Sequence, residues 1–104
     1  MDPEARRVRL DLNSPAFQRS LFDLTKDQQR SVLTTLRKLF EMTWEQVYRD
    51  AGLKWEQIVS RLGERGERLY SLRMGKGFRA VAFREGDWLR FVSLHPDHDS
   101  AYDR

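Results

Sequence analysis

The chain has 104 residues, of which 39% are hydrophobic, 12% aromatic and 34% charged. This size and aromatic content predict one folded domain spanning residues 1–104 and exclude a disordered polypeptide. The absence of cysteine excludes disulfide frameworks and thiolate-bound metals. Because the sequence shows neither a secretory signal nor a bilayer-spanning apolar segment, we expect a cytoplasmic protein without a membrane partner.

The basic residues are divided unevenly between the two types. Of the 19 basic residues, 15 are arginine and 4 are lysine, and the formal net charge is +3. A guanidinium group grips phosphate through two parallel hydrogen bonds, whereas an ammonium group acts as a point charge. This composition is typical of proteins that bind nucleic acid, but a GC-rich genome accounts for it equally well.

The N-terminal part begins with a strand and a helix. Residues 7–12, "RVRLDL", alternate apolar and charged side chains, which predicts a half-buried strand. "NSPAF" then predicts the start of a helix, with Asn13 or Ser14 as its N-cap and Pro15 in the first turn.

Two further helices are predicted by capping boxes. The first box is "TKDQ" at Thr25–Gln28, and the second is "TWEQ" at Thr43–Gln46, which starts a short helix that Gly52 is expected to stop. Trp44 and Trp55 are expected to pack in the core or to contact a partner. After the first box, apolar residues recur at helical spacing and predict one buried stripe, made of Val32, Leu33, Leu36, Leu39 and Phe40.

The C-terminal half changes to a period of two. Residues 68–74, 78–84 and 87–94 read as three successive strands, joined by the Gly-containing segments "GKG" and "REGD". The sequence therefore predicts an α+β fold with the order β-α-α-β-β-β. Its antiparallel, twisted sheet is covered on one face by the N-terminal helices.

Charged residues interrupt these apolar strands. Strict alternation in the last strand places Leu89, Phe91, Ser93 and His95 on one face. An embedded arginine needs a counter-charge, which is either a bound phosphate or a carboxylate of the protein. The arginines in question are Arg73, Arg79 and Arg90, and the carboxylates are Asp97, Asp99 and Glu85.

Both histidines lie in "HPDHDSAY", residues 95–102, and three interpretations are open. The segment is a polar strand end in which Asp99 caps a turn and Tyr102 packs, an acid–base site, or a metal site. Pro96 disfavours a helical pairing of the histidines, and all ligands would come from one short segment. We therefore expect no metal and no other cofactor.

The residues "LYSLRMGKGFRAVAF" and the final "HDSAY" resemble the RelE/ParE superfamily of type II toxins from toxin–antitoxin systems. Members carry an arginine after an aromatic residue, as Arg79 follows Phe78, and a tyrosine beyond the last strand, as Tyr102 does here. "HDSAY" is similar to a divergent branch with an HDxAY motif. The sequence departs from RelE-type members at Leu69 and Ser71, where they carry lysines.

The resemblance implies an mRNA endoribonuclease that inhibits translation. In such enzymes a ribose 2′-OH attacks the adjacent phosphate, so the site needs cations on the phosphate oxygens and groups that transfer protons. The resemblance implies Arg73, Arg79 and Tyr102 as catalytic residues, and His98 lies where the superfamily places further catalytic side chains. Because the lysines are absent, we expect His95 or His98 to transfer the protons. Asp97 and Asp99 would orient the histidines, and the residues implied in nucleic-acid binding are Lys76, Arg84 and Arg90.

Two other functions are compatible with the same resemblance. One is a ParE-like inhibitor of DNA gyrase without catalysis, and the other is a catalytically degenerate domain that only binds nucleic acid or protein. The implied partners are a cognate antitoxin and RNA, with or without the ribosome. Trp44, Tyr48 and Trp55 are expected to contact the antitoxin.

Overall fold

The computed structural model describes residues 6–97. Within them the chain forms three helices and five strands in an α+β fold, the class that the sequence predicts. After a first short strand the helices come first and the remaining strands follow. In chain order the elements are β1 (Arg9–Asp11), α1 (Pro15–Phe22), α2 (Lys26–Phe40), α3 (Trp44–Arg49), β2 (Glu56–Leu62), β3 (Arg68–Gly75), β4 (Phe78–Glu85) and β5 (Trp88–His95).

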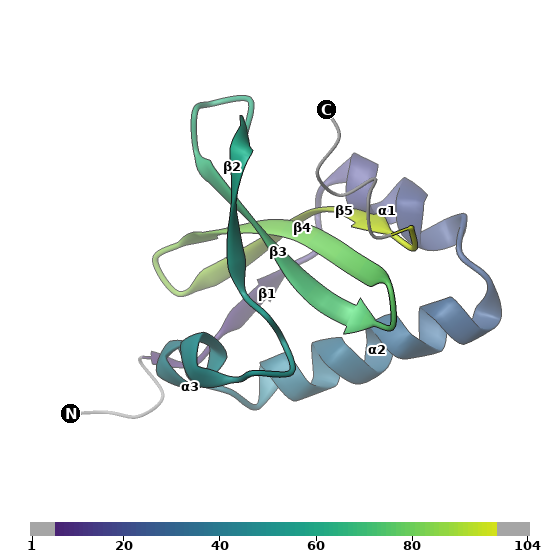
Figure 1. Ribbon diagram of the computed structural model, residues 1–104, viewed down its shortest axis with the longest axis horizontal. Coiled ribbons are helices and arrows are strands. Elements are labelled where there is room, and N and C mark those ends of the chain that lie inside the picture. The colour runs from purple at the N-terminus through teal and green to yellow at the C-terminus, as the bar shows by residue number, and fades with distance from the viewer. Residues whose placement is uncertain (1–5, 98–104) are drawn as a thin grey trace.

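The strands form one sheet in the order β1-β5-β4-β3-β2. The strands from β2 to β5 pair antiparallel with their neighbours, as hairpins require, and β1 joins β5 in parallel. Figure 1 shows α1 and α2 along one side of this sheet, and the β2–β3 hairpin extending away from it. The predicted arrangement, with the N-terminal helices over one face, is therefore confirmed.

The helices begin where their capping residues predict. The Ser14 hydroxyl accepts a hydrogen bond from the backbone N–H of Phe17 and starts α1. Thr25 and Thr43 form reciprocal capping boxes with Gln28 and Gln46 and start α2 and α3. Each box satisfies backbone donors that a helix end leaves without partners, which explains why such local signals locate the helices well.

The end of α3 differs from the prediction. The helix stops at Arg49, and not at Gly52, because Asp50 takes up an extended conformation. Its carboxylate accepts a hydrogen bond from the backbone N–H of Leu53 at 2.9 Å and pairs with Lys38 at 3.1 Å. These contacts end the helix through a side chain, without the glycine cap that was expected.

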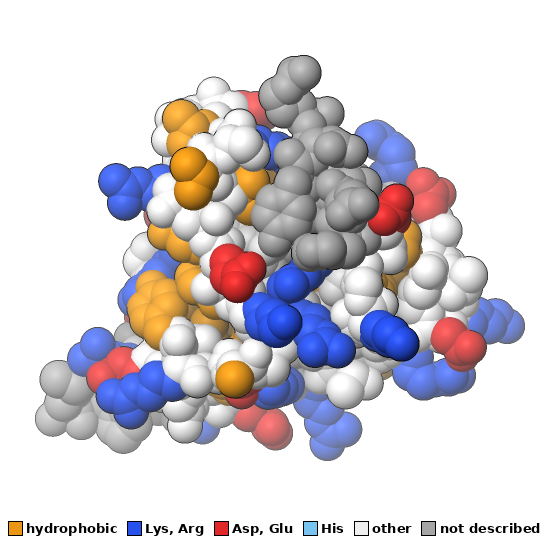
Figure 2. Space-filling view, in the orientation of Figure 1, with side chains coloured by type: hydrophobic (Ala, Val, Ile, Leu, Met, Phe, Trp, Pro, Cys, Tyr) orange, Lys and Arg blue, Asp and Glu red, His pale blue; other side chains and the backbone are white. Residues whose placement is uncertain are grey.

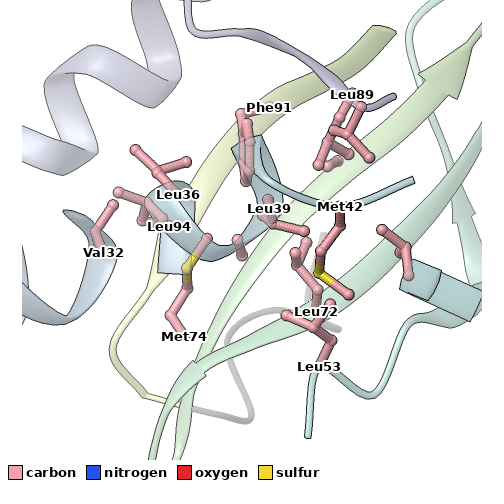
Figure 3. Close-up of a cluster of buried hydrophobic side chains, with 14 of the residues drawn as sticks. Val32, Leu36, Leu39, Met42, Leu53, Leu72, Met74, Leu89, Phe91 and Leu94 are labelled. Carbon is pink, nitrogen blue, oxygen red and sulfur yellow. The ribbon is translucent and has the colours of Figure 1, made fainter. Parts of the chain in front are cut away.

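The main core lies between the helices and one face of the sheet. Figure 3 shows Val32, Leu36 and Leu39 of α2 among side chains of β3 and β5. Its fully or nearly fully buried members are Val8, Phe17, Val32, Leu36, Leu39, Met42, Trp44, Val47, Leu53, Leu72, Met74, Phe78, Ala80, Ala82, Leu89, Phe91 and Leu94.

Two residues of the predicted α2 stripe are outside this core. Leu33 is 67% exposed and Phe40 is 63% exposed, so the prediction that they are buried was wrong. Each follows a buried residue and is therefore rotated by about 100° around the helix axis. The stripe that contacts the sheet is narrower than the apolar pattern suggested.

The sequence pattern did not predict β2. Only Ile58 is buried in this strand, while Glu56, Gln57, Val59 and Ser60 are exposed. β2 lies at the edge of the sheet and its pairing with β3 contains a register shift. An edge strand that buries one side chain has no apolar alternation from which to predict it.

The sheet face without helices carries a smaller apolar cluster. Ile58, Leu69 and Val81 are buried there, and Phe83 and Val92 pack against them. Hereafter this side of the sheet is called the open face. Its apolar cluster occupies only part of the strands, and polar side chains occupy the rest.

Candidate functional site on the open face

Three of the predicted catalytic residues form one row across the open face. Arg73 of β3 lies directly opposite Arg79 of β4, and Arg79 lies directly opposite His95 of β5. Residues that oppose each other in a sheet project to the same side, with Cβ atoms about 5 Å apart. The fold thus brings Arg73, Arg79 and His95 together, although the first and the last are 22 positions apart in the sequence.

A β-bulge in β5 is what places His95 in this row. Ala82 pairs with Phe91, but the next residue of β4, Val81, pairs with Ser93, so Val92 is an extra residue. Beyond it the alternation is reversed: Leu94 joins the core with Phe91, and Ser93 and His95 project from the open face. The expectation that Ser93 and His95 share a face with Leu89 and Phe91 was therefore wrong.

Helix α1 supplies hydrogen bonds to the bulged part of β5. β1 pairs with β5 only up to Arg90. Beyond Arg90, this edge of β5 has no neighbouring strand among the described residues. Instead the Ser14 hydroxyl donates to the backbone carbonyl of Val92 at 3.5 Å, and the Ser20 hydroxyl accepts from the backbone N–H of Leu94 at 3.1 Å. Ser20 of α1 and its N-cap residue Ser14 thereby satisfy backbone groups on both sides of Ser93.

The members of the row differ in exposure and contacts. Arg73 is exposed and makes no ion pair with any carboxylate of residues 6–97. Arg79 is only 9% exposed, and His95 is half-buried. Ser93 Oγ lies 2.7 Å from Nε2 of His95, within hydrogen-bond distance. The alternation in the sequence already places Ser93 and His95 on one face, but only the bulge turns both of them to the side of Arg79.

Lys76 lies near the end of this row. It occupies the tight β3–β4 turn with Gly77, whose φ of +66° suits glycine. Its side chain is exposed. Figure 2 shows Lys and Arg side chains gathered over the part of the view where β3 and this turn lie in Figure 1. Lys76 and Arg73 are thus exposed cations at one end of the sheet.

Arg84 has partners on the opposite, helix-covered side of the sheet. Its guanidinium lies 4.5 Å from the ring centroid of Trp44, and Nη1 donates to the Tyr48 hydroxyl at 2.8 Å. Trp44 is 1% exposed, so the prediction that it packs in the core is confirmed, whereas Tyr48 is 54% exposed. Cation–π and hydrogen-bond contacts of this kind anchor α3 to β4. The role of Arg84 in nucleic-acid binding stays a prediction.

Arg90 is held by two carboxylates at the other end of β5. Its Nη1 lies 2.5 Å from Asp11, and its Nε lies 2.7 Å from Glu85, the counter-charge that the sequence analysis considered. Burial raises the pKa of the Asp11 carboxyl, but the backbone N–H of Asn13 and the Arg90 guanidinium outweigh burial, so its pKa is below the ordinary value. Arg90 therefore has a structural role, and its binding role stays a prediction.

The remaining predicted site residues are in or next to the C-terminal segment. Asp97 is exposed and is the last described residue. His98, Asp99 and Tyr102 lie outside the described residues, so their predicted roles stay predictions. Within residues 6–97, no three His, Asp or Glu side chains are grouped as metal ligands would be.

Comparisons with known proteins identify the fold. No protein-family model matches the chain, and no curated protein is significantly similar to it. Among solved structures, it is similar to a chain of the archaeal RelE–RelB complex from Pyrococcus horikoshii OT3, with 21% sequence identity and a TM-score of 0.57. The alignment covers 88% of this chain and 94% of the archaeal one. The protein has a RelE-like fold.

At 21% identity such similarity establishes a common fold. The activity has to be inferred from the side chains that the fold positions. The RelE-like fold confirms the part of the expected resemblance that concerns architecture. The HDxAY motif of residues 98–102 lies outside the described residues. No helix in the described part of the chain is both long and apolar enough to cross a bilayer.

Proposed function

We propose that this RelE-like protein is a toxin-like endoribonuclease that inhibits translation by cleaving mRNA. The observation that carries the proposal is the row Arg73–Arg79–His95, in register across three strands of the open face. The row combines two permanent cations with an imidazole, which exchanges protons near neutral pH. This is the set of groups that phosphodiester cleavage requires.

The chemistry assigns a role to each member of the row. Arg73 and Arg79 bind the phosphate oxygens, where negative charge increases in the transition state. His95 takes the proton of the ribose 2′-OH as its oxygen forms a bond to phosphorus. The P–O5′ bond then breaks, and the 5′-oxygen receives a proton from a second group. His98 and Tyr102 are the proposed candidates for that second group.

The pairing of Arg73 with Arg79 supports an anionic ligand. The two arginines lie opposite each other on neighbouring strands and project to the same side, so one anion can contact both guanidinium groups. Phosphate suits the pair because guanidinium forks match its oxygens.

RNA cleavage by the purified protein tests the proposal. Wild-type protein is expected to cut single-stranded RNA and to arrest bacterial growth with new mRNA 5′ ends. Arg79→Ala and His95→Ala are each expected to lower the cleavage rate about 100-fold or more. Arg68→Ala, which removes an exposed arginine at the far end of β3, is the matched control and is expected to leave the rate unchanged. Equal cleavage by all four proteins would contradict the proposed site.

Exposed apolar side chains on β2 favour a second candidate function. Val59 is 86% exposed and Leu62 is 59% exposed on this edge strand, and Leu69 and Ser71 of β3 occupy positions where RelE-type members carry lysines. An edge strand with exposed apolar side chains is suited to bind a protein. Growth arrest without new mRNA ends would favour this candidate, such as a gyrase inhibitor, over RNA cleavage.

We also propose that the protein binds a cognate antitoxin through α2. The similar archaeal chain was solved in a RelE–RelB complex. On α2, Leu33 and Phe40 are exposed and separated by two helical turns, so they project from the same side of the helix. Substituting both with Glu is expected to weaken antitoxin binding at least tenfold in calorimetric titration. A double variant at exposed residues next to them, Thr34→Glu with Glu41→Gln, serves as the control. Equal losses of affinity in both double variants would contradict this contact.

A further inference from the structure

We propose that Ser93 is a positioning residue for His95: its hydroxyl holds the imidazole ring in the orientation that proton transfer needs. The inference rests on the proposed function of His95. The observation behind it is the 2.7 Å distance between Ser93 Oγ and His95 Nε2, between two half-buried side chains on the same face of one strand.

The backbone around Ser93 is held in place independently of its side chain. The carbonyl of Val92 and the N–H of Leu94, on either side of it, are bonded to Ser14 and Ser20. Across the sheet, Ser93 pairs with Val81, which is fully buried. The hydroxyl therefore projects from a fixed position between the apolar cluster and the charged row.

A serine hydroxyl suits both protonation states of a histidine. It donates to Nε2 when that nitrogen is unprotonated, and it accepts when Nε2 carries a proton. The last side-chain torsion of a histidine has broad energy minima, so each hydrogen bond to the ring narrows the range of its orientations. The contact with Ser93 thus restricts the ring while allowing it to gain and lose a proton, as a general base must.

The orientation of this ring matters because charged groups face it. Arg79 of β4 lies directly opposite His95, Arg73 of β3 lies one position beyond, and Asp97 follows two residues later. A phosphate bound by the two arginines would lie beside the imidazole. Rotating the ring would exchange the positions of its nitrogens relative to that phosphate, so a fixed ring selects which nitrogen takes part.

The first test is the ¹⁵N NMR spectrum of the His95 ring in the protein without RNA. Ser93→Ala is expected to change the ratio of the two neutral tautomers and the pH dependence of the ring shifts. Ser93→Thr, which keeps a hydroxyl, is expected to restore the wild-type spectrum. Ser60→Ala, at an exposed serine of β2, is the matched control and is expected to leave the spectrum unchanged. Identical spectra for wild type and Ser93→Ala would overturn the proposal.

The second test is RNA cleavage by the same variants. Ser93→Ala is expected to lower kcat about tenfold at unchanged KM and to shift the pH–rate profile, with recovery in Ser93→Thr. A loss of kcat at an unchanged pH profile, with an unchanged NMR spectrum, would make Ser93 merely structural and overturn the proposal. The two proposals fail separately: activity that survives His95→Ala contradicts the proposed function, whereas the NMR experiment tests the contact without any cleavage.

Discussion

The two faces of this sheet are formed by the same strands but differ in the kind of side chains that they carry. On the helix-covered face, Leu72, Ala80 and Phe91 are almost completely buried in a core that extends over all three helices. On the open face, the next residues along two of those strands are Arg73 and Val81, and the apolar cluster there has three buried members. The side of the sheet on which a residue projects, more than its place in the chain, decides whether it stabilises the fold or is available for chemistry.

This comparison separates stability from activity. Burial of large apolar side chains on the helix-covered face provides most of the driving force for folding. On the open face, Arg73 and Arg79 lie opposite each other, and Arg79 lies opposite the imidazole of His95. Substitutions of buried residues on the first face should therefore lower stability, whereas substitution of the exposed Arg73 on the second should change activity at nearly constant stability.

Leu94→Asp is the change with the largest expected effect, because the bulge at Val92 directs this side chain into the core. Leu94 is only 4% exposed. Losing its side chain and burying a carboxylate in an apolar core together cost about 4 kcal/mol or more, close to the whole stability of a small domain. We expect no cooperative thermal transition by circular dichroism.

Ser93→Asp is the control, because it places the same side chain on the neighbouring residue, which projects from the open face and is half-buried. We expect a loss of only about 1 kcal/mol or less in the free energy of unfolding. Equal losses of stability in Leu94→Asp and Ser93→Asp would contradict the assignment of the two residues to opposite faces.

The neighbouring residues Leu72 and Arg73 allow the comparison to be tested within one strand. Leu72 is fully buried, and Leu72→Ala is expected to lower the free energy of unfolding by about 2–5 kcal/mol. Arg73→Ala removes an exposed side chain and is expected to change stability by less than about 0.5 kcal/mol while it lowers RNA cleavage. Urea denaturation followed by Trp fluorescence measures both. Similar losses of stability for the two variants would contradict the separation of roles.

The smallest expected effect concerns the ion pair between Asp11 and Arg90 at the opposite end of β5 from His95. The pKa of Asp11 is lower in the folded protein than in the unfolded chain, where it is about 4. The carboxylate therefore stabilises the fold at pH values above about 4. This stabilisation is lost as the pH falls through the lowered pKa of the folded state. Asp11→Asn is therefore expected to be less stable than wild type at pH 7, with a difference that shrinks between about pH 5 and pH 3.

The exposed Asp23 provides the control for Asp11. Asp23→Asn is expected to follow the wild-type stability curve through the same pH range, measured as urea midpoints. A difference between wild type and Asp11→Asn that is constant with pH would mean that the ion pair does not contribute through ionisation of Asp11.

Sequence patterns located those elements whose signals are local. Ser14, Thr25 and Thr43 start their helices because each cap bonds to a backbone N–H only three residues away. β3 and β4 alternate regularly because each packs against neighbours on both faces. β2 was not predicted, because an edge strand with one buried residue shows almost no alternation of apolar and polar residues.

The sequence by itself determined the α+β class, the helix starts and the residue types of the site, because propensity, capping and alternation act between near neighbours. Only the tertiary structure decided which residues meet. The register between β3, β4 and β5 aligned Arg73, Arg79 and His95, and the bulge at Val92, bonded to the N-cap residue Ser14, turned Ser93 and His95 toward Arg79. A bulge exists only relative to a partner strand, so no pattern within one strand predicts it.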